Sequence, residues 1–208
     1  NAYYDPSLKQ KRSALLQQAG IEIIKADIRQ RSLLETLLNH HNISHVIHLA
    51  AQAGVRHSLI KPQDYVDANL DGFVSLLEAL KNYGRLEKFI FASSSSVYGL
   101  NQKIPFSPED RTDQPTNLYG ATKKANELLA FAYHHLYQIP MVALRFFTVY
   151  GPWGRPDMAY FSFTEKILQD EPIPLFNNGE LQRDFTYIDD VVDGIVKALA
   201  LDCQYEVF

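Results

Sequence analysis

Short apolar runs alternate with helix-like segments along this chain, and that alternation is what most constrains its fold. Residues 44–50, 88–92 and 140–147 are apolar runs that predict strands, the first of them covered on both sides. Between them, apolar residues recur at helical spacing, most clearly over residues 117–137. Such an order implies a mostly parallel sheet with helices on both faces, in which ligands bind beyond the carboxyl ends of the strands. We therefore predict an α/β fold with a doubly wound parallel sheet.

Local signals predict the remaining elements. Asp5 and Pro6 favour the start of a helix, and Gly20 favours its end. Because no strand or glycine-rich phosphate loop precedes this helix, we expect both ends of the chain to be truncated. By the same reasoning we expect helices around residues 33–38, 66–84, 161–169 and 189–200, short strands at 21–25 and 173–176, and a strand-like end at 205–208.

The composition excludes several classes of function. With 20 basic and 24 acidic residues the formal net charge is −4, so nucleic acid is not expected to be the principal partner. The single cysteine, Cys203, rules out an internal disulfide or a Cys-based zinc site and suits a cytoplasmic protein. The seven histidines form no HExxH pattern, so we expect no bound metal. No apolar run approaches the ~20 residues of a membrane span, so no membrane association is expected.

Tyr119 and Lys123 form a candidate proton-transfer pair. Four residues apart on a helix, they share one face, so the lysine ammonium can favour the ionised form of the phenol. A positively charged nicotinamide cofactor could favour the phenolate further, and a hydroxyl from the block Ser93 to Ser96 could relay a proton. The spacing alone also fits an ordinary surface pair on a helix. Only the residues around Tyr119 and Lys123 can distinguish a proton-transfer pair from a surface pair.

With these elements placed, nearly the whole chain resembles the extended short-chain dehydrogenase/reductase family of nucleotide-sugar enzymes. The Ser-Tyr-Lys set of that family falls on Ser94, Tyr119 and Lys123, within the segment SSSSVYG and the pattern YxxxK. The resemblance implies a Rossmann-like fold and NAD as the cofactor, although the residue that selects NAD over NADP is absent. By the same resemblance, the residues expected at the cofactor are Asn1, Asp27, Ile28, Leu49, Ala50, Ala51, Asn69, Tyr119, Lys123 and Phe146.

The family's organisation implies three parts for this chain. Residues 1–150 are expected to form the NAD-binding Rossmann-like domain without its first strand and glycine-rich loop. Residues 151–186 are expected to be part of a small nucleotide-sugar-binding lobe, and residues 187–208 a helix and strand that return to the first domain. Members of the family commonly form homodimers through the helix that bears Tyr119. Leu128, Leu129, Phe131 and Tyr133 could serve that interface or could equally face the sheet.

Within the family, three stretches are most similar to the UDP-glucuronate 4-epimerases: residues 1–9, 145–158 and 182–190. Sugar 4,6-dehydratases of this family carry an Asp-Glu pair where this chain has Ser95 and Ser96, and the decarboxylases carry a Glu at the position of Ser96. The resemblance therefore implies reversible oxidation at carbon 4 without elimination, converting UDP-glucuronate to UDP-galacturonate for a surface polysaccharide.

The resemblance also implies residue roles. Tyr119 would remove the proton of the sugar 4-hydroxyl, Lys123 would lower the phenol pKa, and Ser94 would orient the hydroxyl. Ser95, Ser96, Thr148 and Arg155 would contact the sugar, with Arg155 offering a fork of donors to its carboxylate. Phe176 would lie near the uracil and Arg183 near the diphosphate. The alternatives are an ion pair of Arg155 with Asp157, a backbone hydrogen bond for Thr148, and a core position for Phe176.

Two other functions stay open. The chain could be a 4-epimerase for UDP-glucose or for N-acetylated UDP-sugars. It could also be a non-catalytic module that binds NAD or a nucleotide sugar, because the phosphate loop is missing.

Overall fold

The computed structural model of the chain describes residues 3–175, 177–180 and 182–208. By its internal contacts it divides into two compact units. One comprises Asn1–Lys25 with Thr148–Val191, and the other comprises Ala26–Phe147 with Val192–Phe208. The division expected from the sequence, at residues 150 and 186, differs from this one in grouping the first 25 residues with the larger unit.

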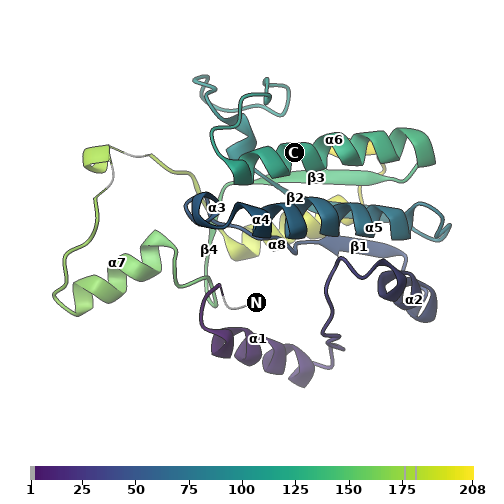
Figure 1. Cartoon of the computed structure of the whole chain (residues 1–208), viewed down its shortest axis with the longest axis horizontal. Coiled ribbons are helices and arrows are strands. Elements are labelled where there is room, and N and C mark those ends of the chain that lie inside the picture. The colour runs from purple at the N-terminus through teal and green to yellow at the C-terminus, as the bar shows by residue number, and fades with distance from the viewer. Residues whose placement is uncertain (1–2, 176, 181) are drawn as a thin grey trace. The chain divides into compact units, whose positions relative to one another are not determined.

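The larger unit is built on a parallel sheet. Its strands are β1 (His45–His48), β2 (Lys88–Ser94), β3 (Met141–Phe146) and β6 (Tyr205–Val207), in the order β1-β2-β3-β6. This confirms the predicted α/β class. Figure 1 labels β1, β2 and β3 of this sheet. β2 and β3 are buried along their length, but Ile47 in β1 is 42% exposed, so the prediction that residues 44–50 are covered on both sides was wrong. β1 pairs with β2 alone and lies at the edge of the described sheet, where cover is thinner.

Helices pack on both faces of this sheet. The helices of the larger unit include α2 (Arg31–His41), α3 (His57–Ile60), α4 (Pro62–Tyr65), the π-helix η1 (Val66–Asp71), α5 (Gly72–Leu80) and α6 (Leu118–Tyr137). α5 and α6 lie in front of the sheet in Figure 1, and α8 (Ile188–Leu199) passes behind it. Phe73, Leu77, Phe89 and Phe91 are completely buried between sheet and helices, and they form the centre of the core. The predicted helix at 66–84 is therefore a π-helix followed by an α-helix that ends earlier.

The smaller unit contains α1 (Pro6–Gln18), β4 (Thr148–Tyr150), α7 (Ala159–Leu168), the 3₁₀ turn η3 (Asn177–Gly179) and β5 (Phe185–Tyr187). β4 and β5 pair in parallel. Asp5 caps α1, accepting a hydrogen bond from the Ser7 amide at 2.9 Å, as its position before Pro6 predicts. No helix in the described ranges is both long and apolar enough to cross a membrane.

Two predicted strands were wrong. Residues 21–25 and 173–175 have no strand structure, and residue 176 lies outside the described residues. A strand needs a neighbour that pairs its backbone, and apolar content does not provide one. Ile21 and Ile24 are 50% and 43% exposed, which fits an apolar run without a paired neighbour. The sequence reading also missed β4 and β5, which have only three residues each.

Candidate active site

The serine block begins where β2 ends. Ser94 is the last residue of β2 and caps the 3₁₀ turn η2 (Ser95–Tyr98), its hydroxyl accepting from the Ser96 amide at 3.2 Å. In the register of the sheet Ser94 lies opposite Phe146, the last residue of β3. Ser94 is buried, whereas Ser95 and Ser96 are half-buried. The three hydroxyls thus stand at the carboxyl edge of the sheet, where a parallel fold places its ligands.

The start of α6, which bears Tyr119, packs tightly against the serine turn. Asn117 caps α6, accepting a hydrogen bond from the Gly120 amide at 2.8 Å. A Cβ on Gly120 would lie only 2.7 Å from the Ser96 carbonyl oxygen, so a larger residue could not approach as closely. The half-buried Tyr119 ring also meets the Tyr65 ring edge to face, with centroids 6.3 Å apart.

Lys123 is buried one helix turn beyond Tyr119. It is 1% exposed, and its Nζ donates to the carbonyl oxygen of Ala92 in β2 at 2.8 Å. Burial lowers the pKa of the Lys123 ammonium to about 8. The ammonium is thus anchored to the strand that leads into Ser94, a contact that the four-residue spacing did not reveal.

Asn69 joins the turn after β1 to α6. Its Oδ1 accepts from the Gln52 amide at 2.8 Å, and its Nδ2 donates to the Gln52 carbonyl at 3.0 Å and to Thr122 Oγ1 at 3.0 Å. The Thr122 hydroxyl in turn donates to the Tyr119 carbonyl at 2.8 Å. Asn69 lies in the π-helix η1, a form of helix that is frequent at functional sites.

The turn after β1 presents one large apolar side chain, Leu49, followed by two alanines. Leu49 and Ala50 are exposed and Ala51 is half-buried. The Tyr65 hydroxyl holds the far side of the turn, donating to the carbonyls of Ala53 at 3.1 Å and Gly54 at 2.5 Å.

The other residues expected at the cofactor lie in the same unit. Arg29 binds the Asp27 carboxylate with Nη2 at 2.8 Å and Nε at 3.1 Å, and these hydrogen bonds lower the pKa of Asp27 to about 2. Ile28 packs over Gly72, where an added Cβ would meet its Cδ1 at 2.5 Å. Asn1, also expected at the cofactor, lies outside the described residues.

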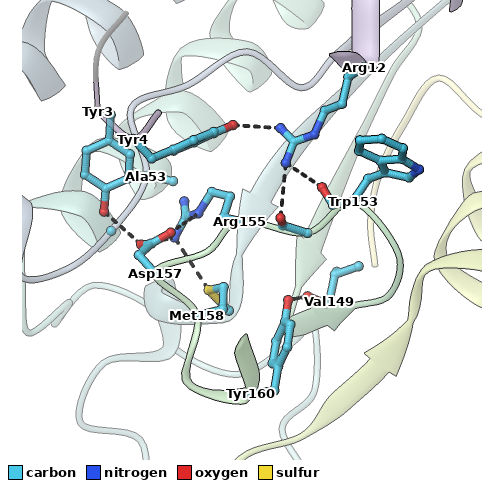
Figure 2. A network of polar contacts seen from close by, with 12 residues as sticks. Tyr3, Tyr4, Arg12, Ala53, Val149, Trp153, Arg155, Asp157, Met158 and Tyr160 are labelled. Atoms are coloured by element: carbon cyan, nitrogen blue, oxygen red, sulfur yellow. Dashed lines mark hydrogen bonds and ion pairs between the residues drawn. The ribbon is translucent and has the colours of Figure 1, made fainter. Parts of the chain in front are cut away.

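Arg155 forms an ion pair within the smaller unit. Its Nε and Nη2 donate to the two carboxylate oxygens of Asp157, each at 3.1 Å, and the Tyr3 hydroxyl donates to the same carboxylate at 3.0 Å (Figure 2). Arg12 of α1 fixes the preceding loop by donating to the carbonyls of Trp153 and Gly154. The ion-pair alternative considered for Arg155 is therefore the arrangement in this structure.

The other residues expected to bind the substrate make few side-chain contacts in the described part of the chain. Thr148 begins β4, and its amide donates to the Asp184 carbonyl at 3.1 Å. Arg183 is exposed and donates to the Gln182 carbonyl. Phe176 is outside the described residues. Ser95 and Ser96 belong to the larger unit, whereas Thr148, Arg155 and Arg183 belong to the smaller one.

The sequence reading missed a buried ion pair beside the serine block. Arg145 in β3 donates from Nε to Glu127 in α6 at 2.9 Å, and Ser93 donates to the same carboxylate oxygen at 2.6 Å. The signal was present, since Arg145 interrupts an apolar run and Glu127 lies one helix turn beyond Lys123. Among the described residues, no group of three or more His, Cys, Asp or Glu side chains could hold a metal ion.

A family model described as the NAD dependent epimerase/dehydratase family matches residues 4–207 of the chain. The chain belongs to that family. The match extends over both units and includes every described residue of the candidate site.

Individual relatives in the family are similar over almost all of this chain. UDP-glucuronate 4-epimerase 3 of Arabidopsis thaliana is 54% identical over 202 residues, covering 96% of this chain and 47% of the relative. The chain thus spans about half the length of that curated relative.

Solved structures of family members share the fold. The UDP-glucuronic acid 4-epimerase of Bacillus cereus, in complex with UDP-glucuronic acid and NAD, superimposes with a TM-score of 0.88 at 40% identity. The alignment covers 97% of this chain and 64% of that one. A UDP-glucose 4-epimerase of Thermotoga maritima with UDP-glucose gives a TM-score of 0.81 at 33% identity, covering 90% of this chain and 62% of that one.

Proposed function

We propose that this chain carries the reaction centre of an NAD-dependent UDP-sugar 4-epimerase that interconverts UDP-glucuronate and UDP-galacturonate. The observation that carries the proposal is the meeting of α6, which bears Tyr119 and Lys123, with the end of β2, which bears Ser94. The two hydroxyl residues after Ser94 lack the acid–base power that an elimination needs. The similarity to UDP-glucuronate 4-epimerases supports the choice of substrate.

The residues present fit a dinucleotide at the carboxyl edge of the sheet. Ala50 and Ala51 place no long side chain over the turn after β1, so a flat cofactor could approach its backbone. Asp27 and Ile28 would contact the adenine and Lys123 the nicotinamide ribose. Leu49, Asn69, Tyr119 and Phe146 would supply further contacts, and Asn1, outside the described residues, is also proposed as a cofactor residue. When bound, NAD accepts a hydride from carbon 4 and returns it.

The protein's own groups would move and hold the proton. Tyr119 takes the proton from the sugar 4-hydroxyl, and Ser94 orients that hydroxyl and relays the proton. With a pKa of about 8, Lys123 is mostly protonated at neutral pH, so its charge favours the phenolate. The 4-keto sugar then turns over in the site, and the proton returns to oxygen 4 when carbon 4 is reduced from its other face.

Six residues are proposed for substrate recognition. Arg155, Thr148 and Ser96 are proposed to hold the sugar carboxylate, Ser95 to contact the sugar, and Phe176 and Arg183 to hold the UDP. Since Asp157 engages two nitrogens of Arg155, the sugar carboxylate must share the guanidinium with Asp157 or replace it.

The test is to incubate the complete product of the gene with UDP-glucuronate and NAD and to follow the products by NMR. UDP-galacturonate is expected, and Tyr119→Phe should lower kcat by about 10²–10⁴-fold. Formation of a UDP-pentose with carbon dioxide would contradict the proposal, and so would recovery of unchanged UDP-glucuronate.

A UDP-glucose 4-epimerase is the second candidate, favoured by the similarity to the Thermotoga maritima enzyme. Arg155→Ala separates the two. If UDP-glucuronate is the substrate, the variant should lose kcat/KM for UDP-glucuronate while a trace activity on UDP-glucose is unchanged. If the wild type and the variant were equally active on UDP-glucuronate, Arg155 would not be the residue that binds the sugar carboxylate.

We further propose that the protein is a homodimer joined through α6. Leu128 and Phe131 are 61% and 55% exposed on this helix, so they offer apolar surface to a second copy. Leu129 and Tyr133 pack against the hydrophobic core instead. A cytoplasmic location stays a prediction from the lone Cys203.

A further inference from the structure

A buried group of charges is bonded to Ser93, the residue before Ser94, and has no part in the reaction proposed above. Glu127 of α6 is 3% exposed and Arg145 of β3 is 7% exposed. The Arg145 guanidinium donates from Nε to Glu127 Oε1 at 2.9 Å and from Nη2 to Oε2 at 3.0 Å. Lys124 adds a hydrogen bond to Oε2 at 3.2 Å. Charges this deeply buried are tolerated because they are paired and hydrogen-bonded.

Both members of the pair are ionised at neutral pH. Burial raises the pKa of the Glu127 carboxyl, but the hydrogen bonds from Arg145 and Ser93 outweigh it and bring the pKa below its ordinary value. Burial acts against the charge on Arg145 as well, yet its hydrogen bonds with Glu127 and Tyr98 raise its pKa. The pair is therefore a permanent ionic link between α6 and β3.

The Glu127–Arg145 pair also bonds to both ends of the segment Ser93–Tyr98. The Ser93 hydroxyl donates to Glu127 Oε1 at 2.6 Å, immediately before Ser94. At the other end, Arg145 Nη1 donates to the hydroxyl of Tyr98, the last residue of η2, at 3.3 Å. Arg145 lies opposite Ser93 in the register of β2 and β3, so the fold brings it to this position.

The catalytic helix is bonded to β2 by the same face that carries its chemistry. Tyr119, Lys123 and Glu127 follow one another at four-residue intervals, which places them along one side of α6. Lys123 bonds to the Ala92 carbonyl and Glu127 to the Ser93 hydroxyl, two consecutive residues of β2. The distance from Ser94 to Tyr119 is therefore set by these two side chains and by the close contact at Gly120.

We propose that Glu127 and Arg145 are positioning residues for the proton-transfer set, an inference that rests on the proposed epimerase function. The pair fixes where Ser94 stands relative to Tyr119 and Lys123. Because proton relay needs hydroxyls held at hydrogen-bonding distance, loosening the pair should slow the chemical step more than it weakens substrate binding.

The first test compares kinetics of the NAD-loaded, complete gene product in two variants. Glu127→Gln keeps the shape of the side chain and an oxygen for Ser93 but removes the charge that Arg145 needs. Ser93→Ala removes only the hydroxyl. We expect kcat to fall by about 10²-fold in Glu127→Gln and about tenfold in Ser93→Ala, with KM changed less than about twofold. The assay uses whichever UDP-sugar the wild type epimerises best, so a wrong substrate assignment leaves this comparison intact.

The second test needs no substrate. The Ser96 amide donates to the Ser94 hydroxyl, so its hydrogen exchange reports where that hydroxyl stands. Exchange at Ser96 should be at least about tenfold faster in both variants than in the wild type. If the wild type proves to have no epimerase activity, the proposed function fails, and this measurement still decides whether the pair positions Ser94.

Tyr205→Phe is the matched control. The Tyr205 hydroxyl donates to the backbone carbonyl of Glu127 at 3.1 Å. The hydrogen bonds described above for the Glu127 carboxylate come from Arg145, Ser93 and Lys124 instead. This variant should keep wild-type kcat and Ser96 exchange even if its melting temperature falls. Wild-type kcat and exchange in Glu127→Gln and Ser93→Ala would overturn the proposal, as would an equal loss in Tyr205→Phe. If Glu127→Gln does not fold, kcat and Ser96 amide exchange of Ser93→Ala test the proposal on their own.

Discussion

Lys123 is a charged side chain in a place where charge is costly, and this one residue sets a pH dependence for the whole unit. Its folded-state pKa of about 8 lies below the ~10.4 of an unfolded lysine. Between these values the unfolded chain binds more protons, so stability should rise with pH through this window. The stabilisation is complete above pH ~10.4 and is lost as the pH falls towards 8.

Lys123→Met should abolish that rise. Denaturant unfolding of the wild type without cofactor should show the free energy of unfolding gaining roughly 3 kcal/mol between pH 8 and 10.4, relative to the variant. The exposed Lys25→Met serves as the control and should follow the wild type. Parallel profiles for wild type and Lys123→Met would show that the ammonium is not buried.

His48 gives a second, more acidic dependence. Burial, and next the charge of Lys123, lower the pKa of His48 to about 4, against ~6.5 in an unfolded chain. Its contribution to stability is complete above pH 6.5 and is lost as the pH falls through 4.

In His48→Phe the new ring can pack against Phe73 and Phe89, whose rings already lie beside the imidazole. The wild type should therefore lose roughly 3 kcal/mol more than this variant between pH 6.5 and 4. Urea titrations at a series of pH values measure the difference, and a constant difference would contradict the assignment.

At the level of elements, the contact between the start of α6 and the serine turn matters most. A Cβ on Gly120 would meet the Ser96 carbonyl oxygen at 2.7 Å, so one of the two backbones would have to shift. Gly120→Ala should destabilise the protein by about 1–3 kcal/mol and lower kcat, because Tyr119 moves with the helix.

Gly194→Ala is the control for that substitution. Gly194 lies in α8 with open space around its Cα, so the substitution should stabilise by about 0.5–1 kcal/mol through helix propensity. Thermal melts and kinetics of both variants check the pair. If both substitutions changed the free energy of unfolding in the same direction, helix propensity would account for the effect at Gly120, and the contact with Ser96 would not.

The elements that the sequence predicted well were those with long periodic patterns or clear caps. α1, α6, β2 and β3 lie where Asp5, Asn117 and the apolar runs place them. The strand expected at residues 21–25 failed because pairing depends on a neighbour distant in sequence. At the site, spacing predicted the face that Tyr119 and Lys123 share. It could not predict that Lys123 would donate to the Ala92 carbonyl, because that is a tertiary contact, and it left open whether Arg155 would pair with Asp157 or with a substrate.

For the whole molecule, the expected dimer gives the clearest test. Leu128→Asp places a charge in the exposed apolar surface of α6 and should convert a dimer to a monomer, seen by light scattering after size exclusion. Leu168→Asp, at a position 81% exposed in α7, is the control and should leave the mass unchanged. A wild type that is already monomeric would exclude this interface.

The order of strands has a consequence for synthesis. β6 completes the sheet by pairing with Met141 to Ala143 in β3, yet residues 148–191 of the other unit are made between the two strands. At about 5–20 residues per second, a ribosome needs several seconds to pass from β3 to β6. During that interval the backbone edge of β3 stands open to any other chain. A chaperone that covers this edge would therefore act after β3 and before β6 is made, when the serine turn η2 has already been synthesised.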